Sequence, residues 1–432
     1  MAKEIKKVTA ATVLLWGKEI GAVAWDAERE LAAFEYTPAF LKEALEPSPL
    51  TMRKGPQIFS FPELNRKTYY GLPGMLADSL PDKFGTALIN AWLARHNRPE
   101  NDFSPVERLC YMGSRGMGAL EYKPALGGRE KNSVPIEIED MIRLAQYVID
   151  NRMDMLVNLG DKDKALETII RIGTSAGGAR AKALIAWNRK TREIRSGQVS
   201  PPKGFESWIM KFDGVQDRTL GVSEGYGRIE YAYHKMAVRA GIQMTECYLY
   251  EENGRAHFLT KRFDRTPEGK KIHMQSLCDI AHYDFNMAGA YGYEQVFNII
   301  LRLKLGYATL DQMYRRMVFN IVARNQDDHT KNIAFLMDKD GNWSLSPAFD
   351  LLWSYNSSGQ WTNQHQMSIN GKRDGFEIND LLVPAKQFGI RNANKIIREV
   401  IEAVRMWPKI AEEHGVPAAT ISKIAATHRL DI

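Results

Sequence analysis

Three oxygen-bearing side chains lie close together in the sequence between residues 327 and 350. Asp327 and Asn332 are separated by four residues, and Asp350 follows after a short stretch with strand character. Magnesium prefers hard oxygen ligands and takes few of them from the protein when phosphates supply the rest. A carboxylate placed against a hydroxyl can orient that hydroxyl as a nucleophile. These residues therefore predict metal-assisted chemistry on a phosphate group.

The spacing D-x-x-x-x-N is that of the protein-kinase catalytic loop, in which the Asp accepts the hydroxyl proton and the Asn holds Mg²⁺. A second Asp after a short hairpin, here Asp350, matches the metal-holding Asp of that scheme. His329 and Lys331 are candidates to offset charge on the transferred phosphoryl group. The spacing alone also fits a solvated polar turn, and the hairpin with Asp350 favours the catalytic interpretation.

The elements around this cluster follow from its neighbours. Apolar residues recur three and four positions apart and predict a buried helix leading into the loop; they are Leu310, Met313, Met317 and Ile321. Residues 333–337 read as a strand, Asp340-Gly341 as a hairpin turn and residues 343–345 as the returning strand. We therefore expect a helix to deliver Asp327 to a loop, and a hairpin to return Asp350 toward the same place.

Phosphoryl transfer also needs a phosphate cradle and a cation, and candidates for both lie upstream. Residues 173–182 form a loop rich in small residues, whose backbone N–H groups can bind phosphate oxygens. Lys211 lies on a predicted strand, and Glu230, on the next helix, is a candidate to pair with it. The loop residues assigned to nucleotide binding are Ser175, Gly177, Gly178, Ala179 and Lys182. Alone, such a loop also fits a tight turn, and a strand Lys also fits a surface charge.

Composition places the chain among ordinary globular proteins. Of 432 residues, 44% are apolar and 25% are charged, and 58 Lys and Arg against 52 Asp and Glu give a formal net charge of +6. This mild excess permits contact with phosphate but does not require nucleic acid as a partner. The three cysteines form no C-x-x-C pair, so a cysteine zinc cluster is not expected. We expect a cytoplasmic chain without a signal peptide or membrane helix.

The sequence resembles the HipA family, the serine/threonine kinase toxins of bacterial toxin–antitoxin modules. The resemblance covers nearly the whole chain in order. It is carried by the segments GLPGMLADSLPDKFG, GTSAGGARAKAL, WIMKFDG, LTKRFDR, HMQSL, NQDDHTKN and SPAFDLL. The D-x-H-x-K-N form is typical of this family among kinase-like folds.

The resemblance implies an α+β, two-lobed protein-kinase-like fold. It suggests a β-rich N-terminal domain over residues 1–130, a region like a kinase N-lobe over 131–265 and a helical C-lobe over 266–432. It also implies roles for individual residues. Lys211 pairs with phosphates, Asp327 is catalytic, and Asn332 and Asp350 hold Mg²⁺; Asp264, in the RFD motif, contacts the ribose. Ser175 or the adjacent Thr174 is the autophosphorylation candidate in the Gly-rich loop.

The resemblance further implies partners. HipA toxins use ATP and Mg²⁺ to phosphorylate aminoacyl-tRNA synthetases, which blocks translation and produces dormancy. A small helix-turn-helix antitoxin, HipB-like, holds them and binds operator DNA, so contact with DNA would be indirect. Two other hypotheses stay open from the sequence. The chain could be a catalytically silent co-repressor docked on such an antitoxin, or a kinase of this fold acting on a small molecule.

Overall fold

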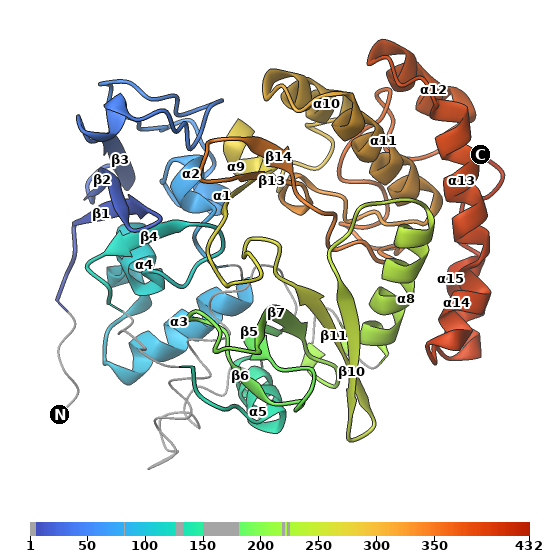
Figure 1. Ribbon diagram of the computed structural model, residues 1–432, viewed down its shortest axis with the longest axis horizontal. Coiled ribbons are helices and arrows are strands. Elements are labelled where there is room, and N and C mark those ends of the chain that lie inside the picture. The colour runs from blue at the N-terminus through green and yellow to red at the C-terminus, as the bar shows by residue number, and fades with distance from the viewer. Residues whose placement is uncertain (1–5, 82, 127–132, 150–180, 218–220, 223–224) are drawn as a thin grey trace. The chain divides into compact units, whose positions relative to one another are not determined.

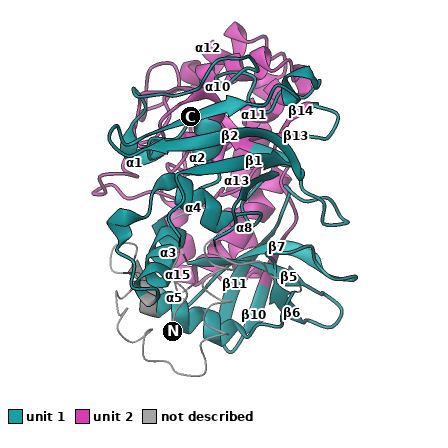
Figure 2. Cartoon of the chain, turned by 90° about the vertical axis from the view of Figure 1, so that its left-hand side faces the viewer, with its two compact units in different colours: residues 1–224, 250–274, 338–341 teal, residues 225–249, 275–337, 342–432 magenta. Residues whose placement is uncertain are grey.

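The computed structural model describes residues 6–81, 83–126, 133–149, 181–217, 221–222 and 225–432. The chain forms two compact units, which Figure 2 separates by colour. Unit 1 comprises residues 1–224, 250–274 and 338–341. Unit 2 comprises residues 225–249, 275–337 and 342–432. The chain therefore passes repeatedly from one unit to the other, and segments distant in sequence share a unit.

Unit 1 begins with a four-stranded antiparallel sheet in the order β3-β2-β1-β4 (Figure 1). Its strands are β1 (Ala10–Leu15), β2 (Lys18–Asp26), β3 (Leu31–Tyr36) and β4 (Leu120–Lys123). Strands β1 and β2 form a hairpin whose turn is Trp16-Gly17. Both turn residues have positive φ, 51° and 81°, which is the backbone that two-residue hairpins favour.

Short helices follow this sheet in unit 1. They are η1 (Phe40–Lys42), α1 (Arg66–Tyr69), α2 (Gly74–Ala77), α3 (Lys83–Arg95), η2 (Glu100–Asp102) and α4 (Pro105–Met112). Helix α4 begins with a capping box in which Ser104 and Glu107 satisfy each other's backbone N–H groups. Glu107 is itself buried and bonded to Arg98 at 2.8 Å, so its charge is paired inside the unit.

The second sheet of unit 1 has the order β10-β11-β7-β5-β6. Its strands are β5 (Lys182–Trp187), β6 (Ile194–Ser196), β7 (Glu206–Lys211), β10 (Cys247–Glu252) and β11 (Arg255–Lys261). Helix α5 (Ile138–Ile149) and α3 pack apolar side chains against it in one core. At the centre of that core the rings of Trp187 and Trp208 meet edge to face, 5.5 Å between centroids. A two-stranded ribbon, β8 (Gln216–Asp217) with β9 (Gly221–Val222), completes the unit.

Unit 2 is mostly helical, as the sequence after residue 275 predicted. Its helices are α8 (Tyr226–Arg239), α9 (Leu277–Ala281), α10 (Tyr293–Arg302), α11 (Tyr307–Val322), η4 (Thr330–Asn332), α12 (Ile378–Gln387), α13 (Ala393–Arg405), α14 (Trp407–Glu413) and α15 (Ala418–Ala425). Helix α8 begins four residues before the predicted Glu230. Gly225, with φ of 79°, adopts the left-handed backbone at its N-cap, which glycine favours.

The hairpin after the catalytic motif is present, with both of its strands in unit 2. Strands β13 (Ala334–Met337) and β14 (Trp343–Leu345) pair antiparallel, with Phe335 opposite Leu345. The connecting turn holds the predicted Asp340-Gly341, and Gly341 has φ of 85°. Strand β12 (His273–Ser276) lies next to β13 in a three-stranded sheet.

Candidate active site in unit 2

Helix α11 delivers the candidate catalytic loop, residues 325–332. From Tyr314 to Val322 nearly every side chain of the helix is buried, so packing fixes the helix firmly. The helix ends at Ala323, and Arg324 then takes the left-handed conformation, with φ of 57°. This reversal is a usual way for helices to stop. The polar loop therefore starts from a rigid point.

The segment after β14 runs beside this loop. Asn325 and Ser354 form a parallel bridge: Gln326 N donates to Ser354 O and Ser354 N donates to Arg324 O, both at 3.1 Å. Asp350, earlier in this segment, has φ of 53°. Asp tolerates this left-handed backbone better than most residues, and such positions concentrate at functional sites. The bridge holds the segment containing Asp350 against the loop containing Asp327.

Asp327 has a half-buried carboxylate with a defined donor. Trp361 Nε1 donates to its Oδ1 at 2.6 Å, and His329 Nε2 lies 3.8 Å from the same oxygen. Burial raises the pKa of Asp327 above its usual range, and the charges of Asp350 and Asp328 add to this effect. His329 and the bond from Trp361 oppose it. A carboxylate with a raised pKa is better suited to accept a proton than an ordinary surface Asp.

Asn332 and Lys331 are each held by another group of unit 2. Asn332 Nδ2 donates to the backbone oxygen of Asp327 at 2.8 Å, which turns its amide oxygen to the other side. Lys331 Nζ lies 3.7 Å from the buried carboxylate of Asp279. Ser276 caps α9 and donates to the same carboxylate at 2.7 Å. Both loop side chains are therefore oriented by the fold.

Asp328 faces the protein interior, opposite in role to Asp327. Its carboxylate accepts from Tyr293 Oη at 2.9 Å, from His365 Nδ1 at 2.9 Å and from Gln366 N at 2.8 Å. Burial alone would raise the pKa of Asp328, but His365 and these hydrogen bonds outweigh it and lower the pKa. Asp328 is therefore an ionised anchor that fixes the backbone next to Asp327.

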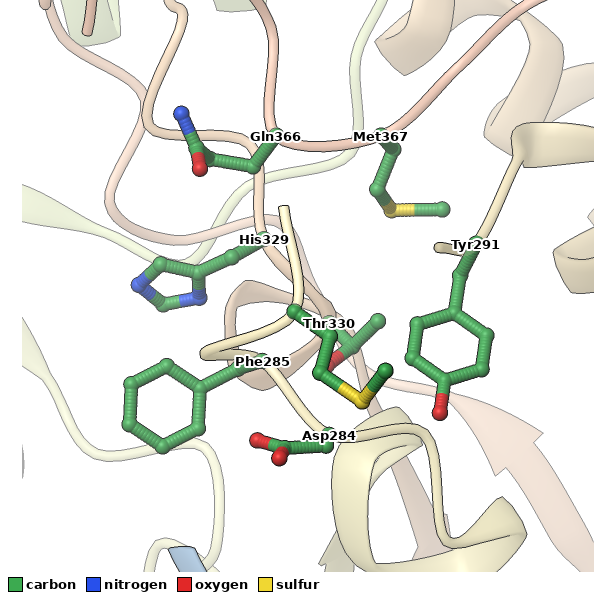
Figure 3. A pocket seen from close by; sticks show the side chains of 8 residues that line it. Asp284, Phe285, Tyr291, His329, Thr330, Gln366 and Met367 are labelled. Carbon is green, nitrogen blue, oxygen red and sulfur yellow. The ribbon is translucent and has the colours of Figure 1, made fainter. Parts of the chain in front are cut away.

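A small pocket lies against the loop, and Figure 3 shows the side chains that line it. They are Asp284, Phe285, Met287, Tyr291, His329, Thr330, Gln366 and Met367. Its empty volume is about 170 Å³. Pockets for drug-sized ligands span roughly 300–1,000 Å³, so this pocket alone is too small for a nucleotide.

Unit 1 carries the candidate phosphate-binding lysines. Lys182 on β5 is directly opposite Lys211 on β7, so both project from the same face of the sheet. Lys211 Nζ lies 5.6 Å from the ring centroid of Phe258 on β11. Thr174, Ser175, Gly177, Gly178 and Ala179 of the Gly-rich loop lie outside the described residues. Glu230 is buried on α8 of unit 2, and its pairing with Lys211 stays a prediction.

Asp264, predicted to contact a ribose, is fully buried in an ionic cluster of unit 1. Its carboxylate accepts two bonds from Arg262 at 2.8 and 2.7 Å, one from Arg265 at 2.6 Å and one from Gly118 N at 2.8 Å. Burial would raise the pKa of Asp264, but the two guanidinium groups reverse the effect and hold it well below the usual range. The carboxylate joins the segment after β11 to Gly118, two residues before β4. A ribose contact stays a prediction.

Sequence reasoning did not find Asp328, Asp279, Trp361 or His365. Asp328 lies in the NQDDHTKN motif and Asp279 lies two residues after HMQSL, but no spacing rule distinguishes a carboxylate facing inward from one facing outward. Trp361 and His365 lie between β14 and α12 in a stretch without regular elements. Trp361 and His365 come close to Asp327 and Asp328 only in the folded chain. Among the described residues, no three His, Cys, Asp or Glu side chains gather as a metal cluster, and no helix is long and apolar enough to cross a membrane.

Comparison with known proteins places the chain in a family. The model of the HipA-like C-terminal domain matches residues 174–407, and that of the HipA N-terminal domain matches residues 11–123. The chain belongs to the HipA family. It is 28% identical over 250 residues to "Putative kinase Y4dM" of Sinorhizobium fredii (strain NBRC 101917 / NGR234). That match spans 54% of this chain and only 59% of the relative.

The fold agrees with this assignment. A chain of the solved complex of HipA, HipB and operator DNA from Shewanella oneidensis MR-1 matches with a TM-score of 0.66 and 18% sequence identity. The match covers 96% of both chains. The expected α+β, kinase-like HipA fold is therefore confirmed. The two compact units do not by themselves test the three predicted domain boundaries, which stay predictions.

Proposed function

We propose that this protein is an ATP- and Mg²⁺-dependent kinase that phosphorylates Ser or Thr of a protein. The observation that carries the proposal is the loop 325–332. It holds Asp327 outward with a raised pKa, anchors Asp328 inward and lies bridged to the segment of Asp350. A solvated polar turn does not need the hydrogen bonds to Asp328 or the bridge between Asn325 and Ser354. The name of the Sinorhizobium relative supports the same activity.

The donor set suits magnesium. The carboxylate of Asp350 and the amide oxygen of Asn332 are hard oxygen ligands, and two such protein ligands are usual when phosphates complete the coordination. When bound, the metal offsets negative charge on the β- and γ-phosphates. We assign Lys211 and Lys182 to the same anionic ligand. The remaining steps use groups of the chain alone.

In the proposed reaction, Asp327 accepts the proton of the substrate hydroxyl through its carboxylate. The hydroxyl oxygen forms a bond to the γ-phosphorus, and the bond from that phosphorus to the β–γ bridging oxygen breaks, so ADP leaves. Trp361 and His329 hold the carboxylate of Asp327 in place. Lys331, oriented by Asp279, can balance charge on the transferred group.

The finer proposals follow from family membership. We propose that the target is an aminoacyl-tRNA synthetase and that a HipB-like helix-turn-helix antitoxin is the partner. The Shewanella complex, which contains HipA, HipB and operator DNA, supports such a partner. We also propose autophosphorylation at Ser175 or Thr174 in the Gly-rich loop. These assignments make the chain a growth-arresting toxin held by its partner.

The test is incubation of the purified protein with Mg²⁺ and γ-labelled ATP, followed by mass spectrometry of the intact and digested chain. We expect phosphate on Ser175 or Thr174. Asp327→Asn and Asp350→Asn should each lower transfer by about 10²–10⁴-fold, because a proton acceptor or a metal ligand is lost. Asp340→Asn, in the exposed turn after β13, is the matched control and should keep transfer.

Three results would contradict this proposal. Wild-type transfer by Asp327→Asn would show that the catalytic loop is assigned wrongly. ATP binding without any transfer to the chain or to synthetases in lysate would favour the silent co-repressor. Label on a metabolite would instead identify a small-molecule kinase.

A further inference from the structure

The groups that position the loop of Asp327 are bonded to a segment about a hundred residues further along the chain. This segment, Thr427–Arg429, follows α15 and is here called the post-α15 segment. It belongs to unit 2, as does the loop. Its contacts fall on the end of α11 and on the residue that holds Asp328. Both are the points from which the loop is positioned.

The first contact is with the end of α11. The last carbonyl groups of an α-helix have no partner inside the helix and need donors from elsewhere. Arg429 N donates to Val322 O at 2.9 Å, and Arg429 Nη1 donates to Ile321 O at 3.1 Å. Tyr233 Oη donates to the next carbonyl, that of Ala323, at 2.8 Å. Donors distant in sequence therefore cap the helix at the point where the loop begins.

The second contact is with His365. Arg429 Nη1 lies 3.1 Å from His365 Nε2, and His365 Nδ1 lies 2.9 Å from Asp328 Oδ2. A guanidinium can only donate, so Nε2 accepts from Arg429 and Nδ1 donates its proton to Asp328. His365 is 0% and Asp328 3% exposed, whereas the side chain of Arg429 is 11% exposed. The guanidinium is itself held by Asp374.

The same segment also fixes the first residue after the helix. Arg324 Nε donates to Thr427 O at 2.7 Å, and Trp353 Nε1 donates to Thr427 Oγ1 at 3.1 Å. Arg324 and Trp353 each lie next to one residue of the Asn325–Ser354 bridge, in the two segments that this bridge joins. One short segment thus contacts the helix end, the residue directly before the loop and the segment that carries Asp350.

We propose that Arg429 is a positioning residue for the catalytic loop, acting through His365 and Asp328. The catalytic role of the loop rests on the proposed function, whereas its positioning by Arg429 does not. The arginine touches no reacting atom. It fixes the start of the loop through the end of α11, and it fixes the backbone at Asp328 through His365. The carboxylate of Asp327, the residue before Asp328, is thereby held outward in one orientation.

The test compares three variants of the full chain. Arg429→Gln removes the charge and the fork of donors. Arg429→Lys keeps the charge, but one ammonium group cannot replace a fork that reaches Ile321 O, His365 and Asp374 together. Arg405→Gln, at the exposed end of α13, is the matched control. Amide hydrogen exchange is measured over residues 325–332 and over α13, together with kcat and KM for ATP.

For Arg429→Gln we expect exchange in residues 325–332 to accelerate at least about tenfold, while exchange in α13 stays at the control rate. We expect kcat to fall by about 10²-fold with KM for ATP within about twofold, because small misplacement of a reacting group is costly. Arg429→Lys should lie between wild type and Arg429→Gln. It also keeps the test decisive if Arg429→Gln fails to fold.

Two outcomes would overturn the proposal. One is exchange in residues 325–332 at the control rate in both Arg429 variants. The other is a uniform acceleration that includes α13, which is the result of a purely global loss of stability. If the wild-type chain transfers no phosphate, the proposed function fails, yet the exchange measurement still decides whether Arg429 positions the loop.

Discussion

The neighbouring carboxylates of Asp327 and Asp328 have opposite environments. Burial, followed by the charges of two neighbouring carboxylates, raises the pKa of Asp327, which accepts one hydrogen bond from Trp361. Asp328 has three donors and a lowered pKa. Active sites often contain two acids whose surroundings give them different pKa values. One of the two can then take part in proton transfer while the other anchors the structure. The roles of the two residues follow from their donors.

The hydrogen bond from Trp361 gives a prediction about pH. This bond favours the ionised form of Asp327, so its removal in Trp361→Phe raises the pKa further. A proton acceptor must be ionised, so the acid limb of the kcat–pH profile should move to higher pH. The rate on the plateau should fall by no more than about tenfold, since one bond of about 1 kcal/mol is lost.

The matched control for this experiment is Trp25→Phe, which removes an indole from β2 of unit 1. Its pH profile should overlay that of the wild type. An acid limb that stays in place in Trp361→Phe would show that another group sets the profile. A limb that moves to lower pH would contradict the sign of the argument.

Single residues show where sequence reasoning succeeds and where it ends. The spacing of Asp327 and Asn332 is local, so a motif can find both. His365 lies 37 positions after Asp328 and bonds to it only because the intervening hairpin returns the chain. No periodicity or spacing rule carries that information. The burial of Asp264 was missed for the same reason, because its partner Gly118 is 146 positions away.

The paired strands β5 and β7 carry the two lysines that are candidates for binding phosphate. Lys182 and Lys211 are register partners on β5 and β7, and like charges at directly opposed positions repel each other. An anionic ligand offsets this repulsion, and phosphate is the anion that the proposed reaction supplies. The sequence placed Lys211 on a strand but could not give its register against Lys182, because register depends on pairing across the sheet.

The register leads to a prediction on ligand-induced stability. A ligand at 100 times its Kd stabilises a protein by about 2.7 kcal/mol, which is seen as a rise in Tm. ATP with Mg²⁺ should therefore raise the Tm of the wild type, and Lys211→Met should lose most of that rise. Lys190→Met, an exposed lysine three residues after β5, serves as the control and should keep it. A full rise in Lys211→Met would exclude the lysine from the nucleotide site.

Regular elements were largely predictable, and the exceptions have physical causes. The buried repeat in α11 and the turn residues Asp340-Gly341 are local signals, and both elements are present. The start of α8 has no such signal because its N-cap is a glycine, which offers no side-chain acceptor to recognise. The stretch of residues 355–375 has no period at all, although it supplies Trp361 and His365.

Across the whole chain, the candidate residues are shared between the two units. Asp327, Asn332 and Asp350 belong to unit 2, whereas Lys182, Lys211 and Asp264 belong to unit 1. The division between the units does not follow the sequence, since residues 250–274 and 338–341 return to unit 1. Segments of this kind cannot be assigned from composition. The resemblance to the HipA family, by contrast, rests on motifs spread along the whole sequence and is confirmed by the two family models.

Family membership and the proposed chemistry together predict an effect on bacterial growth. Expression of the wild-type chain without the proposed partner should arrest growth, because phosphorylation of the proposed synthetase target would stop the charging of tRNA. Asp350→Asn should relieve the arrest at equal protein level, since loss of the metal ligand lowers transfer by about 10²–10⁴-fold. Co-expression of a helix-turn-helix partner should relieve the wild-type arrest as well.

The measurement is a colony count with an immunoblot for protein level, and Asp340→Asn is the control. Equal arrest by Asp350→Asn would mean that toxicity does not come from phosphoryl transfer, and the partner would then be the place to look for function.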